Sequence, residues 1–96
     1  MVRHVVMFKL NSQVTEEERN HWMESVRHLA NEIPDVRNLT LGSDVLRLPR
    51  SYDVALVVDF DSLEGLLTYE HHPAHVAVAA VSRALASHAA SVDFEW

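Results

Sequence analysis

The chain has 96 residues, of which 48% are hydrophobic, and a net charge of −6. Its length fits one domain, so we expect a single unit over residues 1–96. The negative charge excludes a nucleic-acid surface, because phosphate binding needs clustered Lys and Arg. No run approaches the roughly 18 apolar residues of a membrane helix, so no membrane partner is expected. The absence of cysteine excludes disulfides and is compatible with a reducing cytoplasm, which is the expected location.

The first half of the chain predicts a strand, a helix and a second strand. Residues 2–10 alternate as a strand whose two faces are both largely apolar, and because the chain leads straight into it we expect no signal peptide. The sequence TEEE from Thr15 to Glu18 is a capping box that begins a helix, and Pro34 ends that helix. Residues 36–47 predict the second strand, in which Gly42 is a candidate bulge.

The second half predicts a strand, a short helix, a longer helix and a last strand. After a turn at Pro49, residues 52–60 alternate as the third strand. Ser62 caps the short helix, and Pro73 begins the longer one, which runs to about residue 86. Residues 89–96 predict the last strand. The order β-α-β-β-α-β predicts the α+β class with a ferredoxin-like fold, in which the helices cover one face of an antiparallel sheet.

The opposite face of this sheet carries Val5, Met7, Ala55 and Val57. Burying each large side chain among them is favourable by about 1.5–3 kcal/mol. We therefore expect two sheets to pack face to face in a homodimer. The alternative is a monomer whose sheet faces water.

The segment from Tyr69 to His75, YEHHPAH, places three histidines and a tyrosine within seven residues. Pro73 suits the first turn of a helix and pushes His72 out of the α region, so we expect a break at His72. Tyr69 then ends one helix, and His75 lies in the first turn of the next. Histidine exchanges protons near neutral pH, and a phenol can donate a hydrogen bond to a carbonyl oxygen. The segment predicts an acid/base pair at one corner of the fold.

Taken together, four segments resemble the stress-responsive dimeric α/β-barrel (Dabb) family, and the similarity covers essentially the whole chain. These segments are HVVMFK at 4–9, DF at 59–60, SLE at 62–64 and YEHHPAH at 69–75. One branch of this family, the plant olivetolic-acid-type polyketide cyclases, closes linear polyketide chains by aldol chemistry without a cofactor. The resemblance implies that its Tyr and His in the pattern Y-x-x-H-P-A-H fall on Tyr69 and His75, and a further pocket histidine on His4. Val26 and Leu85 stand where that branch has larger aromatic residues, so the resemblance does not imply the substrate of that branch.

Two interpretations of function stay open. The first is a small-molecule enzyme with a pocket between sheet and helices, in which His75 is the general base, Tyr69 donates a hydrogen bond to an enolate oxygen and His4 completes the polar end. It needs no cofactor and takes a small apolar or polyketide-like ligand. The second is a non-enzymatic stress-response protein, structural or ligand-binding, whose main property is the dimer. An open apolar cavity that reaches His75 favours the first. The expected substrate-binding residues are Val6, Phe8, Val26, Leu56 and Leu85.

Each histidine also has a structural interpretation. His75 and His4 can be satisfied by neighbouring backbone or packed in the core, Tyr69 can be a core aromatic, and His72 is expected to hold the turn before the second helix. No metal site is expected at residues 71–75, because the proline breaks the geometry and no cysteine is available. The side-chain pattern of the 30–36 loop does not indicate whether its backbone carbonyls bind a cation. His21, His28 and His71 are expected to be exposed.

Overall fold

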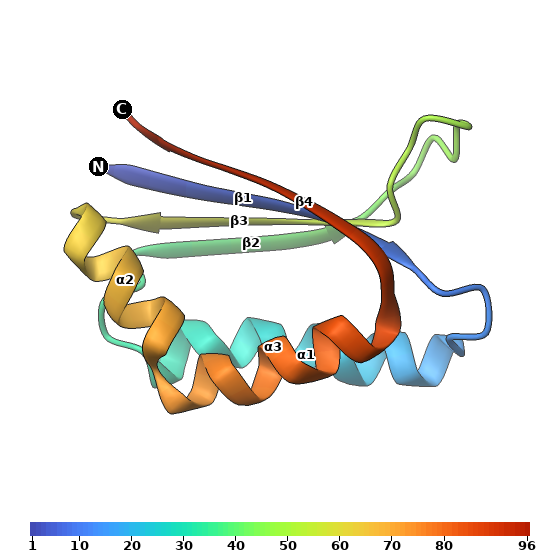
Figure 1. The fold of residues 1–96 in the computed structure, drawn as a ribbon, viewed down its shortest axis with the longest axis horizontal. Helices are drawn as coiled ribbons and strands as arrows, with labels where there is room; N and C mark the ends of the chain where they lie inside the picture. Colours follow the sequence, from blue (N-terminus) through green and yellow to red (C-terminus); the bar gives the residue numbers. More distant parts are fainter.

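A computed structural model describes residues 1–96, and it confirms the ferredoxin-like fold (Figure 1). The helices pack on one face of a four-stranded antiparallel sheet of order β2-β3-β1-β4. The elements in chain order are β1 (Val2–Leu10), α1 (Glu16–Glu32), β2 (Asn38–Ser43), β3 (Val54–Phe60), α2 (Leu63–His71), α3 (Pro73–Leu85) and β4 (Ala86–Glu95).

The helices begin where the sequence predicts. Thr15 Oγ1 accepts a hydrogen bond from the Glu18 N–H at 3.1 Å, and Glu18 Oε1 accepts one from the Thr15 N–H at 3.0 Å, so the capping box is present. His72 interrupts the helical chain between α2 and α3, and its Nδ1 accepts from the Ala74 N–H at 3.1 Å. The structural role expected for His72 is therefore confirmed, and Pro73 takes the first position of α3.

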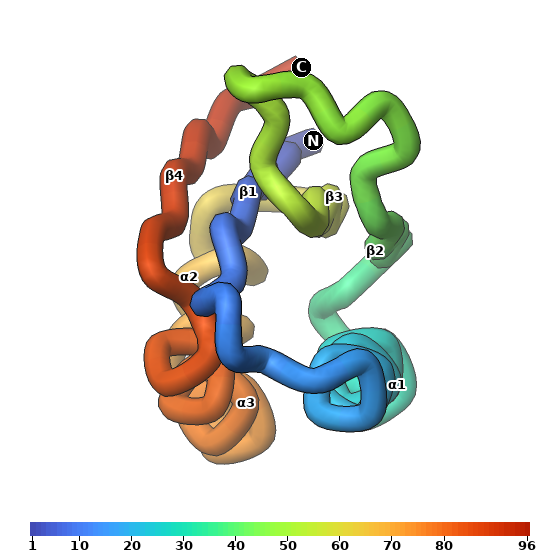
Figure 2. The backbone as a smooth tube through the Cα atoms, turned by 90° about the vertical axis from the view of Figure 1, so that its right-hand side faces the viewer, coloured from blue at the N-terminus to red at the C-terminus, as the bar shows by residue number.

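The core lies between the sheet and the helical layer. Viewed along the sheet, α1 lies beneath the β2 side and α3 beneath the β4 side (Figure 2). Trp22 from α1 is almost fully buried, and its Nε1–H donates to Ser82 Oγ of α3 at 2.8 Å. Ser82 in turn donates to the Val78 carbonyl at 3.0 Å. The bond between Trp22 and Ser82 joins the two long helices beneath the sheet.

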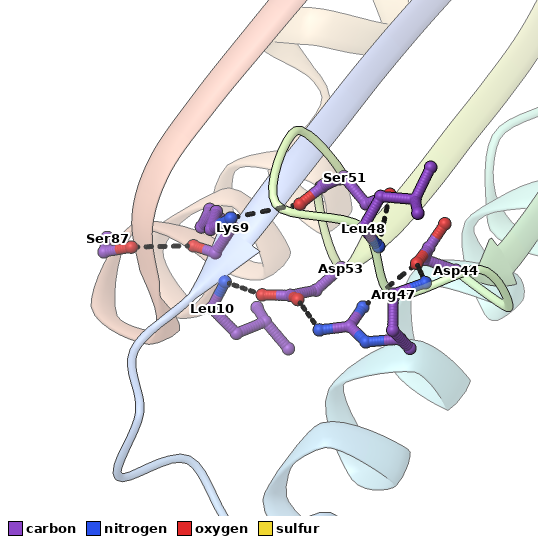
Figure 3. Close-up of polar contacts among 8 residues, drawn as sticks. All are labelled: Lys9, Leu10, Asp44, Arg47, Leu48, Ser51, Asp53 and Ser87. Atoms are coloured by element: carbon purple, nitrogen blue, oxygen red, sulfur yellow. Dashed lines mark hydrogen bonds and ion pairs between the residues drawn. The ribbon is translucent and has the colours of Figure 1, made fainter.

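The second strand is shorter than predicted, and it has no bulge at Gly42. It ends at Ser43, because the carboxylate of Asp44 accepts from the Arg47 N–H at 2.7 Å and turns the chain. Arg47 has a positive φ of 52°, and its guanidinium donates to Asp53 at 2.7 Å. Asp53 also accepts from the Leu10 N–H, so this network fixes the 44–53 loop to the end of β1 (Figure 3).

Other features also differ from the prediction, among them the end of α2, which is His71 instead of Tyr69. The pairing of β2 with β3 is regular, and the register shift lies instead between Lys9 and Leu10, where β1 pairs with β4. The third strand begins at Val54, two residues later than predicted. The last strand begins at Ala86, three residues earlier than predicted, because the chain passes from α3 into β4 without a loop.

The outer face of the sheet is apolar and open. In β1 and β4, Val5 pairs with Val92 and Arg3 with Phe94, so these side chains share the face that points away from the helices. Met7 is 42% exposed and Trp96 60% exposed. None of the helices is long and apolar enough to cross a bilayer.

Candidate active site

A cavity of about 280 Å³ opens between α3, the helix-facing side of the sheet and α1. His4, Tyr69 and His75 all line it, and so do four of the five residues predicted to bind substrate. Those four are Val6, Phe8, Val26 and Leu56. The cavity therefore brings together every predicted polar residue with a mainly apolar wall.

Leu85, the fifth predicted residue, does not line this cavity, so its expected place in the wall is corrected. The last residues of α3 that line the cavity are Ser82 and Arg83. Leu85 is the final residue of the helix and lies beyond them. There it borders a separate depression next to Asn11 and Val14. Its carbonyl accepts a hydrogen bond from the Asn11 N–H at 2.8 Å, which holds Leu85 at that end of the molecule.

The imidazole of His75 is fixed by the backbone of the preceding helix. Its Nδ1 lies 3.1 Å from the carbonyl oxygen of Glu70. A carbonyl oxygen can only accept, so Nδ1 carries the hydrogen and Nε2 of the neutral ring keeps a free lone pair. Burial lowers the pKa of His75 below its ordinary value, against the opposing charge of Glu70. The ring is therefore neutral at pH 7 and can accept a proton at Nε2.

Tyr69 lies directly beside this base. Its ring centre is 4.4 Å from that of His75 and 6.1 Å from that of His4. The residue is 1% exposed, and burial is the main reason that its pKa is raised well above the ordinary phenol value. The hydroxyl stays protonated at all physiological pH values and can donate a hydrogen bond.

His4 reaches the same end of the cavity from β1. It is buried on the helix-facing side of the sheet, directly opposite Asp93 of β4. Its Nδ1 is hydrogen-bonded to the carboxylate of Asp93, which places the hydrogen on Nδ1. Its Nε2 lies 3.9 Å from Oε1 of Glu70. The orientation of His4 is thus set by a carboxylate, and that of His75 by a carbonyl.

Two carboxylates of the site were missed from the sequence. Glu70 places one oxygen 3.9 Å from His4 Nε2 and the other 3.9 Å from His75 Nε2, which is too long for a hydrogen bond but close enough for electrostatic stabilisation. Asp93 orients His4. Glu70 lies inside the YEHHPAH segment, at an unspecified position of the pattern Y-x-x-H-P-A-H. The signal for Asp93 was a charged side chain on the inward face of a strand.

The remaining histidines of the segment take no part in this cluster. His71 is exposed, and its Nδ1 donates to the Leu67 carbonyl at 2.8 Å within α2. The imidazole of His72 caps α3. Side chains 71, 72 and 75 therefore do not converge, and no group of three or more His, Asp or Glu side chains is arranged to hold a metal ion.

Comparison with known proteins places the chain in a family. The model of the Dabb family, the stress responsive A/B barrel domain, matches residues 2–96. The chain is 35% identical over 89 residues to the Streptomyces coelicolor protein SCO4036, covering 91% of this chain and 92% of that one. It is 30% identical over 84 residues to olivetolic acid cyclase of Cannabis sativa, covering 85% and 83%. A dimeric ferredoxin-like protein of unknown function from Thermobifida fusca matches with a TM-score of 0.90 at 28% identity, covering 99% and 90%. The chain is a member of the stress responsive A/B barrel domain (Dabb) family.

Proposed function

We propose that this protein is a cofactor-free cyclase, which closes a linear polyketide-like chain by intramolecular aldol chemistry. The observation that carries the proposal is an apolar cavity lined by His75, whose Nε2 accepts no hydrogen bond within the chain, with the hydroxyl-bearing ring of Tyr69 beside it. The 30% identity to olivetolic acid cyclase supports the same chemistry. A poly-β-keto chain suits the site because its methylene groups, each flanked by two carbonyls, are acidic enough for a neutral imidazole to deprotonate.

In the first step, His75 Nε2 takes a proton from such a methylene carbon, and the electron pair of the C–H bond passes into an enolate. The hydroxyl of Tyr69 donates a hydrogen bond to the enolate oxygen, where negative charge develops. The imidazolium that forms lies near the carboxylate of Glu70, 3.9 Å away, which stabilises its charge.

In the second step, the enolate carbon attacks a ketone carbon farther along the chain and forms the ring bond. The ketone oxygen becomes an alkoxide and takes the proton from the imidazolium, so that His75 returns to its neutral form. The closure is an isomerisation and needs no oxidant or cofactor. Loss of water from the aldol is an elimination: His75 Nε2 takes a proton from the carbon next to the carbinol, the C=C bond forms as the C–O bond breaks, and the leaving hydroxide takes the proton from the imidazolium and departs as water. His4 is held by Asp93, and its ring centre lies 6.1 Å from that of Tyr69. This position suits it to serve as a second proton carrier.

The size of the cavity limits the substrate. A volume of about 280 Å³ lies just below the usual range for small-molecule sites, roughly 300–1,000 Å³. The wall combines the small side chains of Ala79, Ala89 and Val26 with the larger Phe8 and Leu56. We therefore propose a short polyketide-like substrate with a compact apolar substituent.

We propose further that the protein is a homodimer formed by the outer sheet faces. The exposed apolar side chains on that face, with Met7 at 42% and Val92 at 63% exposure, support this assembly. The solved Thermobifida fusca relative is dimeric. The helices lie on the other side of the sheet, so the assembly leaves the α3 side of each cavity accessible.

The second interpretation, a non-enzymatic stress-response protein, predicts the same dimer and the same cytoplasmic location. A purely structural protein gives no role to a neutral imidazole in the wall of an open cavity, and a ligand-binding protein needs it only as a hydrogen-bond acceptor. Its position beside Tyr69 suits proton abstraction, and for that reason the enzyme is the better supported proposal. The experiment that separates the two is cyclisation of synthetic poly-β-ketoacyl thioesters by the purified protein, compared with buffer alone.

A further inference from the structure

The wall that α3 contributes to the cavity has a polar group at each end. His75, Val78, Ala79, Ser82 and Arg83 follow the helical spacing of three and four residues, so they form one stripe. At a rise of about 1.5 Å per residue, His75 and Arg83 are about 12 Å apart along the helix axis. The side chains between them are apolar or small, and Ser82 is already engaged with Trp22 and the Val78 carbonyl.

The guanidinium of Arg83 has no ion pair and no hydrogen bond within the chain, in contrast to those of most other arginines. The other arginines that have carboxylate partners are Arg3 with Asp59, Arg27 with Glu24, Arg37 with Asp61 and Arg47 with Asp53. Arg83 also borders a smaller depression that adjoins the cavity near Phe8 and Ala89. It is the one cationic side chain in the cavity wall, in a protein with a net charge of −6.

We propose that Arg83 binds an anionic group, a carboxylate or a phosphate, of the ligand that occupies this cavity. A guanidinium can hold either group through two parallel hydrogen bonds. The inference builds on the cavity of the proposed function but does not depend on its chemistry. The ligand class is an amphiphilic anion, with an apolar middle against Val78 and Ala79.

The charges of the cavity also orient such a ligand. The carboxylate of Glu70 lies at the His75 end and repels an anion, whereas Arg83 attracts one at the other end. The uncharged, reactive part of the ligand then points toward Tyr69 and His75. Arg83 thereby fixes which end of a chain reaches the base, and this decides which methylene group is deprotonated.

Binding of octanoate and of octanamide, which match in size but differ in charge, tests this proposal by titration calorimetry at pH 7.5. We expect wild type to bind octanoate about tenfold or more tightly than octanamide, and Arg83→Gln to remove this difference while leaving octanamide affinity unchanged. Arg83→Lys keeps the charge near the helix end but loses the paired hydrogen bonds, so it should restore the preference only in part. Octyl phosphate, titrated in parallel, shows whether a carboxylate or a phosphate is preferred.

The control is Arg50→Gln, because Arg50 also lacks a carboxylate partner but borders a depression on the outer face of the sheet. It should leave the preference for octanoate intact, and melting curves check that each variant is folded. Binding needs no turnover, so dependence on Arg83 in a protein that cyclises nothing would uphold this inference and refute the proposed function. An equal octanoate preference in wild type and Arg83→Gln overturns the inference, and so does a failure of wild type to bind either anion at millimolar concentration.

Discussion

The side chain of His75 and the backbone of Glu70 are joined by a hydrogen bond of 3.1 Å, from Nδ1–H to the carbonyl oxygen. The tautomer of the proposed base is therefore set by the main chain of α2, and the Glu70 side chain acts separately, through its charge. Replacing that side chain should change the pKa of His75 without changing which nitrogen carries the hydrogen. The effect of the Glu70 backbone on the tautomer and the effect of its side chain on the pKa can therefore be measured separately.

The first prediction concerns pH. Burial lowers the pKa of His75 below the ordinary histidine value near 6.5, so the neutral, proton-accepting form persists below neutral pH. The cyclisation rate should stay constant from pH 8 to below pH 6.5 and fall as pH drops through the lowered pKa, since an imidazolium cannot accept a proton. A rate that halves above pH 7 contradicts this assignment. The measurement is kcat/KM against pH, together with the ring-proton titration of His75 by NMR.

The second prediction concerns Glu70→Gln. The negative charge of Glu70 raises the pKa of His75 against the effect of burial, so its removal should lower that pKa further. The acid limb of the rate profile should move to lower pH, while the ¹⁵N signals of the ring still report hydrogen on Nδ1. The ring signals of exposed His21, recorded at fixed pH, are the internal control and should not change. An unchanged or higher His75 pKa would show that the carboxylate does not act on this ring.

The third prediction concerns stability. Ser82→Ala removes the acceptor of the buried Trp22 Nε1–H, so we expect the free energy of unfolding to fall by about 1–3 kcal/mol in urea titrations. Ser25→Ala is a matched control, because Ser25 also donates to a carbonyl four residues earlier but accepts nothing from the core. It should cost well under 1 kcal/mol, as exposed substitutions usually do. Equal losses in the two variants would mean that the Trp22 bond contributes little.

The fourth prediction concerns assembly. Light scattering should give a dimer for wild type, with a total interface of roughly 1,200 Å² or more. Val57→Glu or Met7→Glu should yield a monomer or an unfolded chain, because a charge in that layer loses water without gaining a partner. Val81→Glu is the control, since Val81 is an exposed apolar residue of α3 on the opposite layer. A wild type that stays monomeric at high micromolar concentration refutes the assembly.

Local sequence rules predicted the elements that depend on local chemistry. The capping box at Thr15, the proline at position 73 and the alternation in β1 each act within a few residues, and each element formed as expected. The end of β2 was missed because it depends on side chains of the 44–53 loop folding back onto Asp53 and the end of β1. Such contacts join residues that are distant in sequence, and no local pattern reports them.

The residues of the site divide in the same way, into those placed by local sequence and those placed by contacts between distant segments. His75 and Tyr69 lie close together because one short helix break places them, and the YEHHPAH segment encodes that break. The contact of His4 with Asp93 depends on the register between β1 and β4, which the chain order alone does not fix. Leu85 lies outside the cavity because the part of α3 that lines it ends at Arg83. Where this part ends depends on how the helices pack on the sheet.

The most direct test is the cyclisation rate of poly-β-ketoacyl thioesters with wild type, His75→Ala, Tyr69→Phe and the surface control His21→Ala. Wild type and the control should form cyclic product faster than buffer, and His75→Ala should lose this activity while melting within a few degrees of wild type. Tyr69→Phe should be slower by about ten- to a hundredfold, equivalent to about 1.4–2.7 kcal/mol of transition-state stabilisation. Equal product from wild type, His75→Ala and buffer would contradict the enzymatic account and favour the binding protein.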